Sequence, residues 1–189
     1  MKLWKKVCTN LCLASLMAVG MTSIATAKDP IKAEQPILIT SFGQAPDGNT
    51  ISVLAKRSGI TTTYETLAPA SRVGDFKSVI ISLGVSLKGF GAAGVNLDTE
   101  MARAAEIVDA AKAKNIPVIG IHIGGSGRRD QMSNKLIEAY AEKMDMLVVY
   151  QDGNKDGVFT DIAKKNDIPI IEIQKLSELK ATLESFMMK

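Results

Sequence analysis

A glycine-rich segment directly after an apolar run carries residues suited to binding an anion. Residues 78–83 are mostly β-branched and apolar, which predicts a strand buried on both faces. Four glycines follow within residues 84–94, with Ser86 and Lys88 between them. Backbone N–H groups of a glycine-rich turn, together with a lysine or arginine, form a receptor for a carboxylate or phosphate. The sequence therefore predicts a ligand-binding loop here.

Three further segments share this character, and all four are expected to leave the strands at one edge of a sheet. The four segments are 42–49, 84–97, 124–130 and 151–157, whereas the turns at the opposite strand ends are short and ordinary. Ligands of parallel sheets bind outside the carboxyl ends of the strands, so we expect one shared site. The predicted ligand-binding residues are Gln44, Ser86, Lys88, Gly89, Gly91, Gly94, His122, Gly124, Gly125, Ser126, Arg128 and Arg129.

A purely structural interpretation of the same residues stays open. Turns between strands and helices use glycine in any case, and the loops could serve only packing. Arg128 and Arg129 could form a solvated surface pair or partner the carboxylates of Asp98 and Asp130. The protein would then be an interaction domain without a small ligand.

A hydrolase is a further hypothesis. Residues 84–88 read Gly-Val-Ser-Leu-Lys, which approaches the nucleophile elbow G-x-S-x-G but lacks its last glycine. His122 and Asp152 are expected at neighbouring strand tips, so Ser86, His122 and Asp152 are the candidate catalytic residues. His122 is the single histidine of the chain, and a lone histidine at a strand end is often structural.

Two other motifs are weaker. Residues 89–94 match G-x-G-x-x-G, but they follow the third predicted strand rather than the first, which argues against dinucleotide binding. Residues 152–157 match the start of a calcium loop, so Asp152, Asn154 and Asp156 are weak metal candidates. Ala163 stands where the bidentate glutamate belongs, which favours a turn before a helix. We expect no cofactor and no histidine- or cysteine-based metal site.

Strands and helices are predicted to alternate along the chain. The predicted strands are 36–41, 60–67, 78–83, 116–123, 146–150 and 168–173, and the predicted helices are 50–58, 98–114, 133–143, 158–165 and 177–188. This alternation predicts a three-layer, doubly wound α/β fold, flavodoxin-like or Rossmann-like, with about six parallel strands. The second strand is mixed in polarity and suits a sheet edge. We therefore expect the order 2-1-3-4-5-6, with a switch point between the first and third strands.

The first 27 residues have the features of a secretory signal peptide. Lys2, Lys5 and Lys6 precede an apolar stretch, and residues 25–27 read Ala-Thr-Ala, which predicts cleavage after Ala27. Residues 28–35 are expected to form a polar tail, and 36–189 a single domain. Cleavage would remove both cysteines and leave 20 basic and 20 acidic residues, which argues against nucleic-acid or membrane-surface binding.

Three stretches together resemble an uncharacterised family of bacterial exported α/β domains, a domain of unknown function. They read LGVSLKGFGAAG (83–94), IHIGGSGRRD (121–130) and DGNKDGVFTDIA (152–163), and the resemblance covers about residues 36–186. It implies export and one intact domain, and it names no substrate.

The sequence thus predicts an exported, periplasmic or secreted domain that binds a small carboxylate or phosphate ligand. An exported hydrolase using Ser86, His122 and Asp152, and an envelope protein-interaction domain, are the alternatives. The sequence predicts no nucleic-acid partner and no membrane span after cleavage. Oligomeric state stays open.

Overall fold

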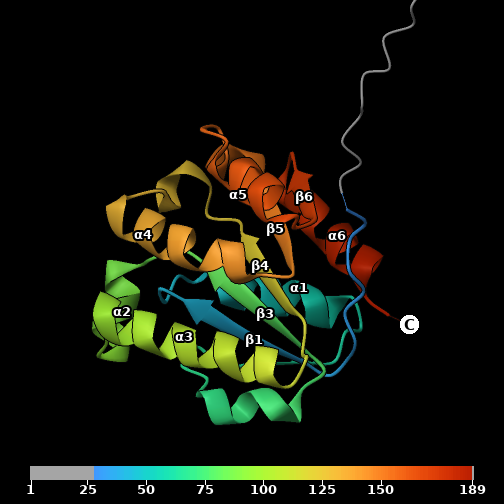
Figure 1. The fold of residues 1–189 in the computed structure, drawn as a ribbon, viewed down its shortest axis with the longest axis horizontal. Helices are drawn as coiled ribbons and strands as arrows, with labels where there is room; N and C mark the ends of the chain where they lie inside the picture. The colour runs from blue at the N-terminus through green and yellow to red at the C-terminus, as the bar shows by residue number, and fades with distance from the viewer. Residues whose placement is uncertain (1–27, 189) are drawn as a thin grey trace, which may run out of the picture.

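Residues 28–188 are described by a computed structural model, in which six parallel strands form one sheet (Figure 1). The strand order is β2-β1-β3-β4-β5-β6, so the predicted order is confirmed. β2 is the short edge strand, and the switch point lies between β1 and β3. The strands are β1 (Ile37–Phe42), β2 (Thr62–Tyr64), β3 (Ser78–Leu83), β4 (Val118–His122), β5 (Met146–Tyr150) and β6 (Ile170–Ile173).

Helices cover both faces of the sheet, as expected for a three-layer α/β fold (Figure 1). α3, α4 and α5 pack on one face, and α1 and α6 pack on the other. The helices are α1 (Asp47–Arg57), α2 (Leu87–Ala93), α3 (Leu97–Ala113), α4 (Gln131–Tyr140), α5 (Val158–Asn166) and α6 (Leu179–Phe186). Short 3-10 turns include η1 (Ala70–Asp75), η2 (Gly125–Arg128) and η4 (Gln151–Gly153).

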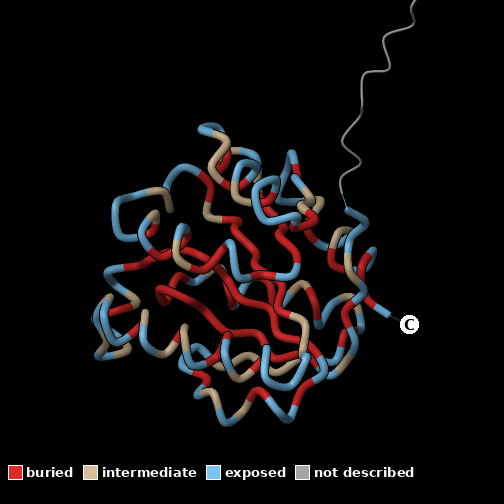
Figure 2. Tube along the Cα trace, in the orientation of Figure 1, coloured by how far each residue is buried: buried red, intermediate tan, exposed pale blue. Residues whose placement is uncertain are grey.

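The strands form the buried centre of the molecule (Figure 2). Alternate residues of β1 point to opposite faces: Leu38 and Phe42 join the cluster under α3 and α4, and Ile37 and Ile39 join the cluster under α1 and α6. A strand with helices on both sides must be apolar on both sides. This explains the continuous apolar runs.

The segment 84–97, which the sequence predicted as an open loop, contains a helix. α2 spans Leu87–Ala93 despite Gly89 and Gly91, because Ser86 caps its first turn and Gly94 ends it at φ 67°. The following helix, predicted as 98–114, begins at Leu97. Asn96 caps α3 through a capping box with Thr99, and the two side chains accept each other's backbone N–H at 3.0 and 3.1 Å.

The N-terminal segment is held against the domain, and its firmest contacts are at Ala33. Ala33 is fully buried and hydrogen-bonds to Phe186 and Met188 in the C-terminal segment. The expected polar tail therefore contributes to the core at this residue. The predicted signal peptide, 1–27, lies outside the described residues. Within residues 28–188, none of the helices has the length and apolar character that a membrane crossing requires.

Candidate functional site

The loops that follow β1, β3, β4 and β5 lie at one edge of the sheet and contact one another. The loops after β1 and β3 are joined by the Ser86 N–H, which donates to the Gly43 carbonyl at 2.8 Å. Ser126 joins the loops after β4 and β5, since its N–H and hydroxyl both donate to Asp152 Oδ2 at 2.8 Å. This layer holds two large recesses and a smaller one of about 150 Å³ between the loops after β4 and β5, so the single expected site is divided.

The first recess is a groove of about 740 Å³ at the switch point between β1 and β3. Two cationic side chains, Lys88 and Arg128, lie on it. Pro46, Leu67 and Ala92 are among its apolar residues. The groove is lined by Gln44, Ala45, Pro46, Tyr64, Thr66, Leu67, Ser86, Lys88, Gly89, Ala92, Ala93 and Arg128.

Neither groove cation has an acidic partner among the ion pairs of residues 28–188. Lys88 is exposed in the first turn of α2. Arg128 is half-buried and donates from Nη1 to the Val85 carbonyl at 3.2 Å. Its side chain lies flat across Gly124, where a Cβ would stand 2.1 Å from Arg128 Cγ. Gly124 therefore allows the Arg128 side chain to pack directly against the backbone, where any larger residue would displace it.

Asp47 lies beside Arg128 and is a feature that the sequence analysis missed. Its Oδ2 is buried without a hydrogen-bond partner, close to Gly124. Burial raises the pKa of the Asp47 carboxyl, while the charges of Arg128 and His122 act in the opposite direction. Asp47 is thus a partial internal counter-charge for Arg128. The sequence had indicated Asp98 and Asp130 as the carboxylate partners of the loop arginines.

A buried ion pair holds the loop after β1 in place. Glu100 is fully buried, and its Oε1 accepts hydrogen bonds from Gly43 N–H at 2.9 Å, Gln44 Nε2 at 2.8 Å and Arg103 Nη2 at 2.6 Å. Arg103 also donates to the Ala68 carbonyl at 3.1 Å. Gln44, a predicted ligand residue, is therefore a structural element of the groove wall. The sequence offered one signal for this, since Glu100 and Arg103 are three residues apart on a helix.

Ser86 and Gly89 also have structural roles at the groove. The Ser86 hydroxyl accepts a hydrogen bond from Gly89 N–H at 3.1 Å. A Cβ on Gly89 would stand 2.1 Å from the Gln44 carbonyl oxygen, so no larger residue fits there. Gly91, by contrast, has open space where a Cβ would lie. Several loop glycines are thus explained by packing between the loops.

His122 does not line the groove, contrary to expectation. It is fully buried at the end of β4, with Nδ1 2.8 Å from the Leu83 carbonyl oxygen and Nε2 3.3 Å from that of Gly125. Gly153 lies over the ring, and Phe159 packs against it with centroids 5.0 Å apart. Burial lowers the pKa of His122, although its hydrogen bonds to the two carbonyls raise it.

The three candidate catalytic residues have other partners. Ser86 caps α2, His122 bonds to backbone carbonyls, and Asp152 bonds to Ser126 and Lys155. No hydrogen bond joins Ser86, His122 and Asp152 in the described structure. In residues 28–188 the three side chains therefore do not form an assembled triad.

Arg129 points away from the groove and is fully paired. It forms two hydrogen bonds to the Asp156 carboxylate at 2.7 and 3.0 Å, and its guanidinium stacks on Phe159 at 5.4 Å. The Asp156 pKa is lowered by this pair. Of the two adjacent arginines, only Arg128 reaches the groove.

The calcium-like motif forms a turn with all three candidate side chains engaged. Asn154 Oδ1 accepts the Phe159 N–H at 2.9 Å, which anchors the start of α5. Asp156 pairs with Arg129, and Asp152 pairs with Lys155, whose hydrogen bond lowers the Asp152 pKa. Within residues 28–188 no group of three acidic, histidine or cysteine side chains is placed to share a metal ion.

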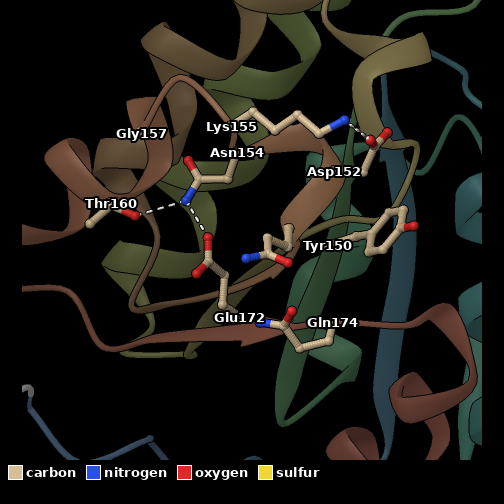
Figure 3. Close-up of a pocket in the computed structure, with 9 residues that line it drawn as sticks. Tyr150, Asp152, Asn154, Lys155, Gly157, Thr160, Glu172 and Gln174 are labelled. Atoms are coloured by element: carbon tan, nitrogen blue, oxygen red, sulfur yellow. Dashed lines mark hydrogen bonds and ion pairs between the residues drawn. The ribbon is translucent and has the colours of Figure 1, made fainter.

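The second recess lies at the ends of β5 and β6 and has a volume of about 690 Å³ (Figure 3). It is polar and shares no residue with the groove. It is lined by Tyr150, Gln151, Asp152, Asn154, Lys155, Gly157, Thr160, Glu172 and Gln174.

The chain belongs to a family described as a domain of unknown function (DUF6305), whose model matches residues 34–187. This bears out the resemblance to an uncharacterised family, without showing the three signature stretches or export. Comparison with curated proteins finds no match.

Several solved structures are similar at low identity. A GDSL-like lipase from Bacteroides thetaiotaomicron VPI-5482 is 16% identical with a TM-score of 0.34, and the match covers 72% of this chain and 66% of that one, just under two thirds. A protein from Desulfitobacterium hafniense DCB-2, assigned to the G-D-S-L lipolytic family, is 17% identical with a TM-score of 0.37. The match covers 72% of this chain and 75% of that one. An esterase of the SGNH-hydrolase family is 11% identical with a TM-score of 0.29, covering 76% and 77%. These TM-scores lie below 0.5, so the likeness assigns no function to this chain.

Proposed function

We propose that this member of the DUF6305 family is a binding domain for a small organic anion, held in the groove between β1 and β3. The observation that carries the proposal is the pair of cations, Lys88 and Arg128, on one groove without a salt-bridge partner. Like charges on one recess repel each other unless an anion lies between them. The buried Asp47 carboxyl offsets only part of the charge of Arg128.

The groove also favours a ligand with an apolar body. Pro46, Tyr64, Leu67, Ala92 and Ala93 contribute to its lining. Its volume of about 740 Å³ lies within the range of about 300–1,000 Å³ typical of small-molecule sites. A carboxylate attached to an aromatic or aliphatic group fits this combination better than a compact inorganic ion.

Export of the protein belongs to the same proposal. It is supported by the basic start, the apolar stretch and the Ala-Thr-Ala sequence before Lys28. N-terminal sequencing of the protein produced in a bacterial host should then read from Lys28. A mature protein that still begins at Met1 would contradict export.

The binding test is anion-induced thermal stabilisation at constant ionic strength. Benzoate, acetate and inorganic phosphate are the probes, with chloride adjusted to keep screening equal. A probe at 100 times its Kd adds about 2.7 kcal/mol to the free energy of unfolding. We expect benzoate to bind more tightly than acetate, because only benzoate occupies the apolar wall.

The decisive variant is Lys88→Ala/Arg128→Ala, which should weaken benzoate binding at least tenfold. The matched control is Arg57→Ala/Lys164→Ala, which removes one exposed arginine and one exposed lysine far from the groove and should change affinity less than twofold. Equal stabilisation of the wild type and the Lys88/Arg128 variant would refute anion binding in the groove.

A protein-interaction domain is the second candidate, and one observation favours it. Leu87, the first residue of α2 and a neighbour of Lys88, is 69% exposed, the highest exposed fraction among the large apolar side chains of residues 28–188. If no anion stabilises the protein, Leu87→Ser should reduce association with a partner recovered from the cell envelope.

A further inference from the structure

The recess after β5 and β6, here called the β5–β6 pocket, contains polar groups that the fold does not use. Three of its side chains, Tyr150, Gln151 and Gln174, make no hydrogen bond through their polar atoms within residues 28–188. One carboxylate oxygen of Glu172 is likewise unused, since Asn154 bonds only to Oε1. In Figure 3, Glu172 and Gln174 lie on one side of the pocket and the Tyr150 ring lies on the other, with its hydroxyl pointing away from them.

The frame that carries these free groups is rigidly held. Asn154 is 6% exposed, and its amide nitrogen donates to Thr160 Oγ1 at 2.7 Å and to Glu172 Oε1 at 2.6 Å (Figure 3). These bonds join the β5 loop, α5 and β6. On the other side, Asp152 is fixed by Lys155 and by two hydrogen bonds from Ser126. The frame of the pocket is thus fixed before binding, whereas the exposed side chains of Gln151 and Gln174 become ordered on binding.

The charge balance of the pocket argues against an ionic ligand. Asp152 and Lys155 neutralise each other, and the two glutamine side chains are uncharged. Glu172 is left as the only charge without an ionic partner, which disfavours an anion. A simple cation would engage Glu172 but would leave the N–H donors of Gln151 and Gln174 without acceptors.

Hydroxyl groups of a ligand match the free carboxamides of Gln151 and Gln174 and the free carboxylate oxygen of Glu172. Each hydroxyl both donates and accepts, and each carboxamide offers two donors and one acceptor, so one glutamine can bond to two adjacent hydroxyls. Glu172 adds an acceptor, and Tyr150 adds an aromatic ring that can pack on C–H groups. The volume of about 690 Å³ accommodates one or two sugar rings.

We infer that the β5–β6 pocket binds a neutral polyhydroxylated ligand of saccharide type. This inference does not depend on anion binding in the groove, since the two recesses share no residue. The two sites are also chemically distinct, because the groove has two cations outside the salt bridges of residues 28–188, whereas the lysine of this pocket is paired with Asp152.

The test is isothermal titration calorimetry of the purified protein against glucose, galactose, N-acetylglucosamine, cellobiose and maltose. We expect at least one of these sugars to bind with a Kd below about 10 mM. Gln151→Ala/Gln174→Ala should weaken that sugar at least tenfold, and Glu172→Gln, which keeps an acceptor for Asn154, should weaken it severalfold.

Two controls locate the binding. Gln131→Ala removes an exposed glutamine on α4, and Lys88→Ala removes a cation of the groove, and both should leave the sugar affinity within twofold. No sugar binding at 10 mM, or equal affinity in the Gln151/Gln174 variant, would overturn the inference. Glucosamine, which carries a cationic amine, is titrated as well. If it alone bound, and Glu172→Gln abolished its binding, the inference would be overturned in favour of a cation site.

Discussion

Replacing Glu100 with glutamine removes the charge at the centre of the buried network and nearly nothing of its shape. Glu100 is fully buried, and the Arg103 side chain is only 13% exposed. In the wild type, the carboxylate accepts from Arg103 Nε at 3.1 Å and Nη2 at 2.6 Å, and also from Gly43 and Gln44. The variant places an amide NH2 against a guanidinium that has only donors.

The expected cost follows from leaving one charge of a buried pair without its partner. Breaking such a pair costs about 3–5 kcal/mol. Domains of this size are stable by about 5–15 kcal/mol, so a large part of the total would be lost. At about 2–4 °C per kcal/mol, Glu100→Gln should lower the Tm by about 6–20 °C.

The assay is urea unfolding, followed by circular dichroism, of the wild type, Glu100→Gln, Arg103→Met and the double variant. Because both substitutions remove the same pair, the double variant should lose less than the sum of the two single losses. Glu106→Gln, an exposed glutamate on the same helix, is the matched control and should cost less than about 0.5 kcal/mol.

One result would refute this reasoning. If Glu100→Gln and Glu106→Gln lowered the free energy of unfolding equally, the pair would not hold the β1 loop. If the reasoning holds, Glu100→Gln at a temperature where it stays folded should also weaken benzoate binding. The reason is that Glu100 positions Gln44, which lines the groove.

Three further predictions concern titration and turn structure. The single histidine, His122, should stay neutral in NMR titrations to below pH 6.5, with its ring proton on Nδ1. As the pH drops below about 6.5, the unfolded chain takes up a second ring proton before the folded protein does, so the free energy of unfolding should fall. A folded-state pKa above 6.5 would contradict this. Asp47→Asn should raise the Tm at pH 7 relative to the control Asp161→Asn, because it removes a buried negative charge. The gain in Tm should vanish as the pH falls through the raised Asp47 pKa, since the wild-type carboxyl is then neutral. An unchanged Tm at pH 7 would contradict burial of the charge. Asn154→Ala should lower the free energy of unfolding in urea by about 1–3 kcal/mol, since it leaves the buried Phe159 N–H at the start of α5 unpaired. The control Asn49→Ala, at an exposed position, should lower it much less. Equal losses would show that the turn does not depend on Asn154.

The sheet and its order were accessible from the sequence because they depend on local patterns. Continuous apolar runs predict strands covered on both faces, and the polar composition of residues 60–67 indicated an edge strand, which is β2. The common edge of the four glycine-rich loops followed from the parallel order alone. The helix α2 was missed because two glycines lower the helix propensity of a seven-residue segment, while its stability comes from caps and from the burial of Phe90.

The identity of the site residues was decided by tertiary structure. Arg128 and Arg129 are adjacent in the sequence, yet one lines the groove and the other pairs with Asp156. The sequence does not show that Glu100 and Asp47 are buried, because a charged residue on a helix is usually solvated and only the tertiary packing decides which one is enclosed. The sequence determined which loops gather at one edge, through the period and polarity of each strand. Which side chains face a cavity depends on contacts between residues far apart in the chain, and no local pattern encodes those contacts.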